Sequence, residues 1–164
     1  MLCANTFNMC FARSFSGRRM KIHSAINLND NLMESQSFYM KELMAVKDML
    51  DRTHQSEYNL FILDEIYKGT NTLERIAASK AVLSALAVNG NMVLVSTHDI
   101  ELADLLAEEY DLYHFCEQIE QNQLYFDYLI KQGKLKNRNA IRLLEIEGYP
   151  ESVVSEAISI TEKL

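Results

Sequence analysis

The sequence lacks most of the features that would place it in a specialised class. It has no tryptophan, one proline, five glycines and three cysteines in 164 residues. The cysteines are odd in number and have no metal-ligand spacing, which argues against a disulfide framework and against a structural zinc site with four convergent ligands. No apolar run approaches the roughly 18 residues of a membrane span, and no secretory signal opens the chain. We therefore expect a cytoplasmic protein without a membrane partner.

The net charge of the chain limits which partners it can bind. The chain carries 23 acidic and 16 basic side chains, for a net charge of −7. Neutralising phosphates is the main source of affinity for nucleic acid, so an acidic domain without a basic stripe is a poor DNA binder by itself. With 48% hydrophobic residues the chain can bury one substantial core. We expect any DNA contact to come through domains that this chain does not contain.

A short apolar run, Leu60 to Leu63, ends in two adjacent carboxylates, Asp64 and Glu65. The run is too short for an independent helix and is bounded by polar residues, which favours a buried strand of an α/β sheet. Ligands bind at the carboxyl edge of such sheets, and phosphoryl transfer needs one carboxylate for Mg²⁺ and another group for the attacking water. The alternative is a strand that ends in a solvated acidic pair.

A second apolar strand is predicted over residues 92–97, before His98, and an alanine-rich helix over 72–89 separates the two strands. This order predicts a right-handed βαβ unit with parallel strands, which brings Asp64, Glu65 and His98 to one sheet edge. Alternatively, the residues around His98 only start the next helix, with Thr97 or Asp99 as its cap.

The other expected elements complete the chain. They are a strand pair over residues 8–26 turning near Ser16-Gly17, helices over 36–53 and about 99–109, two strands over about 111–119 and 122–130, and two closing helices near 139–147 and 150–162.

The motif Asp64-Glu65-Ile-x-x-Gly69-Thr70-x-Thr72, with a Ser-Thr-His after the next strand, resembles the ATPase domain of the MutS DNA mismatch repair family, a branch of the ABC-type ATPases. A serine-containing run around Ser37 and a Gly-x-Pro corner at residues 148–150 extend the similarity. The resemblance implies an α/β, ABC-type P-loop ATPase core with a mostly parallel sheet flanked by helices. Residues 1–135 would form the partial ATPase domain and residues 136–164 a C-terminal helical pair.

The same resemblance implies a composite site that binds ATP with Mg²⁺ between two subunits, in a homodimer or with a MutS-like partner. Asp64 would order Mg²⁺ through water, Glu65 would polarise the lytic water, and His98 would sense the γ-phosphate. The ATP-binding residues implied by the resemblance are Ser37, reaching across to the partner's nucleotide, and Gly69, Thr70, Asn71 and Thr72 in the loop after the carboxylates. Physically, Ser37 could equally be a plain helix cap, and Thr70 or Thr72 could cap the helix that follows.

The chain departs from the family in two places. It contains no G-x-x-x-x-G-K-[ST] loop, the segment whose backbone N–H groups hold phosphates. We therefore expect an N-terminally truncated member that lacks the first strand and P-loop and does not hydrolyse ATP alone. Leu73-Glu74-Arg75 also replaces a common family run, which indicates a divergent branch. The competing hypothesis is a non-catalytic dimerisation or interaction module, or an inactive remnant.

Overall fold

The computed structural model describes residues 13–26, 38–54, 57–120, 123–135, 140–161 and 163. The contacts separate the chain into two compact units, residues 1–110 and 111–164, and each is described by itself. The predicted division between residues 135 and 136 lies inside the second unit and stays a prediction. Ser37, Cys3 and Cys10 lie outside the described residues.

The first unit is an α/β layer structure. Its elements are β1 (Lys21–Ala25), α2 (Phe38–Arg52), β2 (Asn59–Asp64), α3 (Thr72–Leu86), β3 (Met92–Ser96) and α4 (Ile100–Leu105). The three strands form a parallel sheet in the order β1-β2-β3, so β2 is central. The predicted βαβ unit and parallel sheet are thereby confirmed, with Asp64 in register beside Ser96.

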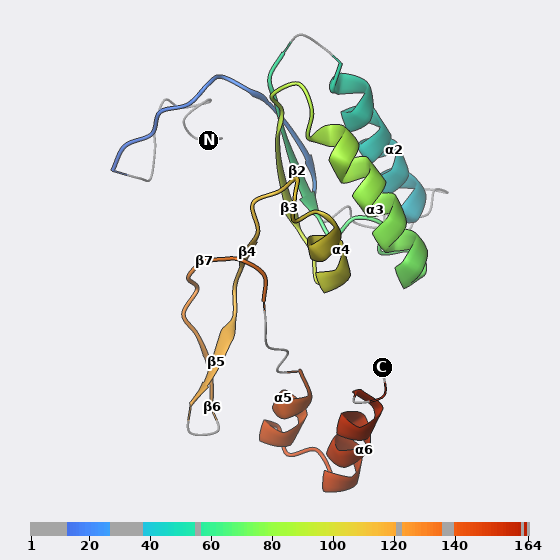
Figure 1. The fold of residues 1–164 in the computed structure, drawn as a ribbon, viewed down its shortest axis with the longest axis vertical. Coiled ribbons are helices and arrows are strands. Elements are labelled where there is room, and N and C mark those ends of the chain that lie inside the picture. The colour runs from blue at the N-terminus through green and yellow to red at the C-terminus, as the bar shows by residue number, and fades with distance from the viewer. Residues whose placement is uncertain are drawn as a thin grey trace. The chain divides into compact units, whose positions relative to one another are not determined.

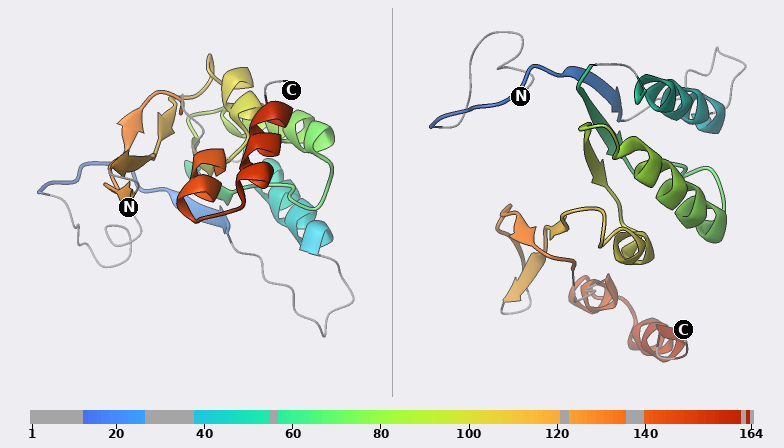
Figure 2. Two further views of the ribbon diagram at one scale, coloured as in Figure 1. Left: turned by 90° about the horizontal axis from the view of Figure 1, so that it is seen from below. Right: turned by 45° about the horizontal axis from the view of Figure 1, so that its top comes forward.

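The core lies between this sheet and two helices. Figures 1 and 2 both show α2 and α3 side by side along one face of the sheet. Phe61 and Leu63 of β2 are buried against that layer, together with Leu83 and Leu86 of α3. β2 lies between β1 and β3, and apolar side chains occupy four of its six positions, a pattern typical of buried strands in parallel sheets.

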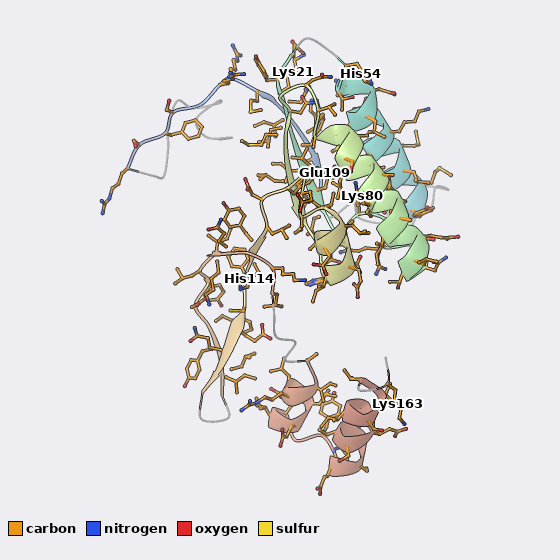
Figure 3. The ribbon with its side chains drawn as sticks, viewed as in Figure 1. Lys21, His54, Lys80, Glu109, His114 and Lys163 are labelled. Carbon is orange, nitrogen blue, oxygen red and sulfur yellow. The ribbon has the colours of Figure 1, made fainter. Side chains whose placement is uncertain are left out.

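The edge strand β3 alternates instead. Val93 and Val95 pack against the core, whereas Met92 and Leu94 are exposed. Successive side chains of a strand point to opposite faces, so the alternation shows that β3 is covered by described residues on one face. Lys80 of α3 also pairs with Glu109, which follows α4, and the two side chains lie close together in Figure 3.

The predicted strand pair over residues 8–26 is wrong for its described part. Residues 13–20 form no strand, and β1 pairs in parallel with β2 rather than with a neighbouring strand of a hairpin. This long-range pairing buries Ala25 in the core. An isolated two-stranded hairpin offers no such burial and is only marginally stable, which explains why the distant partner is preferred.

Two helix ends also differ from the sequence prediction. Helix α3 ends at Leu86, with Ala87 as its C-cap, and not at residue 89. Asn89 and Gly90 have φ angles of 55° and 75°, so they form a left-handed turn after the helix. Helix α4 covers Ile100–Leu105, and turns occupy the rest of the range predicted as helix up to residue 109.

The second unit contains β4 (Tyr113–His114), β5 (Glu117–Glu120), β6 (Gln123–Phe126), β7 (Lys131–Gln132), α5 (Ala140–Ile146) and α6 (Glu151–Thr161). The strands form two antiparallel pairs, β4 with β7 and β5 with β6. The closing helical pair is confirmed. The first predicted strand, about 111–119, is divided into β4 and β5, whereas the second, about 122–130, contains only β6, because β7 lies beyond it. Gly148 turns between the helices with φ 75°, and the Pro150 carbonyl accepts a hydrogen bond from the Val154 N–H.

In the part of the chain that the structure describes, no helix is long and apolar enough to cross a membrane. Cys116 is a free thiol.

The central strand should dominate the stability of the first unit. Leu63 is 2% exposed and Leu94 of β3 is 52% exposed, so the two leucines form a matched pair. We expect Leu63→Ala to lower the free energy of unfolding by about 2–5 kcal/mol, because it opens a cavity in the core. Leu94→Ala should cost less than about 1 kcal/mol. Urea denaturation of both variants measures the difference, and equal losses would contradict this account of the sheet.

Candidate functional site

The carboxyl ends of β2 and β3 meet at one edge of the sheet, where a pocket opens. Ten residues line this pocket: Glu65, Ile66, Lys68, Arg75, Val95, Ser96, Thr97, His98, Asp99 and Leu102. The backbone N–H of Glu65 donates to the Ser96 carbonyl at 3.0 Å, so the ladder between the strands continues one residue past β2. This bond fixes the first residue of the loop after β2 beside the end of β3.

Glu65 and His98 are in direct contact at this edge of the sheet, where the sequence predicted that both would lie. His98 Nε2 lies 2.7 Å from Glu65 Oε1, and Lys68 Nζ lies 3.0 Å from Oε2. Both oxygens of the Glu65 carboxylate therefore have a nitrogen partner. The Glu65 side chain is 27% exposed and that of His98 is 90% exposed, so the histidine can move without disturbing the core.

Asp64 ends β2 with its carboxylate beside β3. The Ser96 hydroxyl donates a hydrogen bond to this carboxylate, a partner that the sequence analysis did not single out. The position of Ser96 could have identified it, because Asp64 and Ser96 end neighbouring parallel strands and are paired in register. Among the described residues there is no group of three or more His, Cys, Asp or Glu side chains that could hold a metal ion. One carboxylate with a hydroxyl beside it fits Mg²⁺ that keeps its waters and phosphate ligands.

The loop of Gly69 to Thr72 makes local bonds. Asn71 is the N-cap of α3, and its side chain accepts a hydrogen bond from the Glu74 N–H at 3.0 Å. The Thr70 hydroxyl donates to the Glu74 carboxylate at 2.9 Å. The helix-cap alternative is thus correct in kind but wrong in residue, because Asn71 caps the helix and neither threonine does.

An ion pair ties the loop that carries His98 to α3. Arg75 donates to both oxygens of Asp99 at 2.9 and 2.7 Å, and both side chains are largely buried. Asp99 occupies the N-cap position of α4, yet its side chain makes no capping bond there. The Thr97 hydroxyl accepts from the Asp99 N–H at 3.0 Å instead. A bidentate pair of this kind fixes orientation as well as distance, so it holds Asp99, the residue after His98, against α3.

Glu42 of α2 is the main residue that sequence analysis missed. It is only 4% exposed, and its Oε1 accepts a hydrogen bond from the Tyr67 backbone N–H at 2.7 Å. Its Oε2 is buried without a hydrogen-bond partner among the described residues. Burial raises the pKa of Glu42 from its ordinary value, and burial, with Glu42 and Tyr39 nearby, raises the pKa of Tyr67 to about 12.

A sequence signal for Glu42 exists. Val46 and Met49 follow it at spacings of four and seven residues, and both lie in the core. A helical face defined by i, i+4 and i+7 positions would therefore have placed the carboxylate toward the interior.

Two comparisons with known proteins bear on this site. A family model described as MutS domain V matches residues 11–164. Curated relatives are similar across most of the chain. The "DNA mismatch repair protein MutS" of Aquifex pyrophilus is 31% identical over 146 residues, covering 87% of this chain and 17% of the relative.

Two further relatives carry the same name. The protein of Listeria monocytogenes serotype 4a (strain HCC23) is 29% identical over 147 residues, covering 88% of this chain and 17% of the relative. The protein of Chlamydia trachomatis serovar D (strain ATCC VR-885 / DSM 19411 / UW-3/Cx) is 32% identical over 145 residues, covering 85% of this chain and 17% of the relative. The chain thus spans about a sixth of the length of these relatives.

The buried carboxyl of Glu42 should make stability depend on pH. Its pKa is raised above 4.5 in the folded chain, mainly by burial, while the Tyr67 N–H and Lys68 oppose the shift. The folded state then binds this proton more readily than the unfolded state, so the contribution of Glu42 to stability falls as pH rises from about 4.5 through the folded pKa.

Glu42→Gln cannot ionise, so its stability relative to the parent should rise across that pH range and then level off. Urea denaturation at several pH values measures this difference. Glu108→Gln, at an exposed carboxylate, is the control for the substitution itself, and the trend of Glu42→Gln is judged against it. A constant difference between Glu42→Gln and the parent would contradict the prediction.

Proposed function

The chain belongs to the MutS family through its domain V, and we propose that it supplies the carboxylate and histidine parts of an ATP hydrolysis site shared between two subunits. The observation that carries the proposal is the contact between Glu65 and His98 beside Asp64, at the carboxyl edge of a parallel sheet. This edge is where α/β sheets bind nucleotides. The chain spans 17% of its relatives' length, so the activity of the whole relatives is carried over to this chain only as part of this proposal.

Asp64 is assigned to the water shell of Mg²⁺, with the Ser96 hydroxyl holding its carboxylate in place. Magnesium bound with ATP would supply positive charge against the phosphate oxygens. Glu65 is assigned to the lytic water, whose proton its carboxylate would accept as oxygen attacks the γ-phosphorus.

His98 and Lys68 would release the Glu65 carboxylate when nucleotide binds. In the structure they contact the two oxygens of Glu65. A γ-phosphate brought to this edge carries more negative charge than one carboxylate, so it attracts the His98 N–H and the Lys68 ammonium. Their movement toward phosphate would leave a Glu65 oxygen available to the attacking water.

The partner's contribution rests on the family resemblance. Ser37, before α2, is assigned to the partner's γ-phosphate, and the Gly69 to Thr72 loop to contact with ATP and the other subunit. Thr70 and Asn71 already make side-chain bonds to the start of α3, so their contacts to a nucleotide would involve backbone groups or a rearranged cap. The exposure of Leu73, 81%, leaves an apolar side chain beside the loop for a second subunit. DNA would be bound by other parts of a longer protein.

A second candidate function is a non-catalytic interaction module. The observation that favours it is the lack of any glycine-rich phosphate loop in the 164 residues. Both candidates are tested in a chimeric MutS protein, in which the aligned part of this chain replaces the matching region of the Aquifex pyrophilus relative. An interaction module predicts a folded chimera that binds its partner subunit and does not hydrolyse ATP.

Glu65→Gln is the direct test of the proposed base. In the chimera it should leave ATP binding within about twofold and lower kcat by about a hundredfold or more, the usual cost of losing a general base. Glu108→Gln, at an exposed carboxylate away from the pocket, is the matched control and should turn over like the parent. Binding by calorimetry and steady-state phosphate release are the measurements. Equal turnover in Glu65→Gln and the parent would assign Glu65 to a structural role.

A shared site predicts complementation between subunits. Ser37→Arg should block the partner's site, and Glu65→Gln should block the site in its own subunit. A mixed dimer then has one intact site, so mixing should restore about a quarter of the parent's activity if subunits exchange at random. Phosphate release is measured for each variant alone and for the mixture, and analytical ultracentrifugation reports association with ATP. A monomer with no recovery on mixing would exclude the shared site.

A further inference from the structure

We propose that Glu42 is a positioning residue that fastens helix α2 to the loop of residues 65–69 and thereby holds Glu65 at the edge of the sheet. The link between helix and loop is a property of the chain alone. Its consequence for hydrolysis rests on the function proposed above. Neither the family match nor the relatives' names assign a role to this carboxylate.

The first contact is a hydrogen bond in a water-excluded place. Glu42 Oε1 accepts from the Tyr67 N–H at 2.7 Å, two residues after Glu65, and both residues are 4% exposed. A backbone N–H in the interior must find an acceptor, because leaving it unpaired costs the full desolvation of that group. Glu42 is thus the acceptor that allows this loop to turn inside the core.

The second contact is steric and comes from the same helix. A Cβ placed on Gly69 would lie 3.0 Å from the Cβ of Tyr39, so the loop backbone approaches α2 as closely as a glycine permits. The rings of Tyr39 and Tyr67 also meet edge to face, with centroids 6.3 Å apart. Helix α2 therefore contacts the loop at Tyr67 and again at Gly69, on either side of Lys68.

The loop needs such support because its backbone is strained. Glu65 and Tyr67 have φ angles of 48° and 65°, in the left-handed region that side-chain-bearing residues rarely adopt. A conformation of this kind persists only when surrounding contacts impose it. The Tyr67 N–H points to Glu42 in this conformation, so loss of the acceptor would allow the loop to relax and Glu65 to leave His98.

The presence of a carboxylate at position 42, rather than a neutral acceptor, indicates the role of this residue. The buried Oε2 has no hydrogen-bond partner among the described residues, and burial raises the pKa of the group, so the charge weakens the fold at neutral pH. A glutamine would offer Tyr67 an oxygen without that cost. A charged acceptor, however, makes the stronger bond to an N–H, which favours positioning of the loop over stability as the role of this residue.

Hydrogen exchange on the 164-residue chain tests the link without any nucleotide. Glu42→Met keeps the side chain's length and helix preference but removes the acceptor, and Glu42→Gln keeps an acceptor without charge. Val46→Ala, on the same buried face of α2, is the control that lowers global stability without removing this bond. Exchange at Tyr67 is compared with exchange at the core strand β2, so that global unfolding is separated from local opening.

We expect the Tyr67 amide to exchange about 10- to 100-fold faster in Glu42→Met than in Val46→Ala, with Glu42→Gln between Glu42→Met and the parent. Equal Tyr67 exchange in Glu42→Met and Val46→Ala would overturn the proposal. If Glu42→Met does not fold, Glu42→Gln decides: faster Tyr67 exchange than in the parent supports the link, and unchanged exchange overturns it.

The chimera described above gives the second measurement. Glu42→Met should lower kcat about tenfold with KM for ATP within about twofold, and Glu42→Gln should recover most of that loss, because the displaced group is the base rather than a binding residue. An unchanged kcat in Glu42→Met would overturn the positioning role. A chimera without ATPase activity, in which Glu42→Met still speeds Tyr67 exchange, would reject the proposed function and leave the link between α2 and the loop established.

Discussion

The parallel pairing of β2 with β3 is the constraint on which the rest of the first unit depends. Its register sets Asp64 beside Ser96, and the Glu65 N–H extends the pairing to the Ser96 carbonyl. Because side chains alternate between faces along a strand, a slip of one residue would turn Asp64 toward the helices and separate it from the Ser96 hydroxyl. The approach of His98 to Glu65 follows from the same register, since each residue lies just beyond the end of its strand.

The part of this arrangement that could be predicted from sequence is the part set by local pattern. The apolar run of β2, the alanine-rich segment of α3 and the second apolar run specify their own structures, and right-handed crossover then brings their ends together. The partner of β1 could not be predicted in this way. Its pairing with β2 is decided by the burial of Ala25 in a core formed by distant segments, and nothing near residues 21–25 identifies that partner.

The polar residues of the site also differ in whether the local sequence pattern predicts them. Asp64, Glu65 and His98 were found because they follow predicted strands, and a position at a strand end can be recognised in one sequence. Glu42 lies within a helix, where a glutamate is normally solvated. Only its spacing from Val46 and Met49 identifies it as buried, and its contact with Tyr67 depends on a left-handed loop that sequence patterns do not predict. Asn71 was likewise named in the loop but not as the cap of α3.

The helices on the covered face each hold one loop of the site. Glu42 of α2 binds the segment after β2, Asn71 and Glu74 close the start of α3, and Arg75 of α3 binds Asp99 after β3. Helices α2 and α3 pack on one core with β2, the strand that carries Asp64, so these bonds join segments that share the same core. The geometry at the sheet edge therefore depends on how α2 and α3 pack against the sheet. Changes in that core would alter the site even where no site residue is replaced.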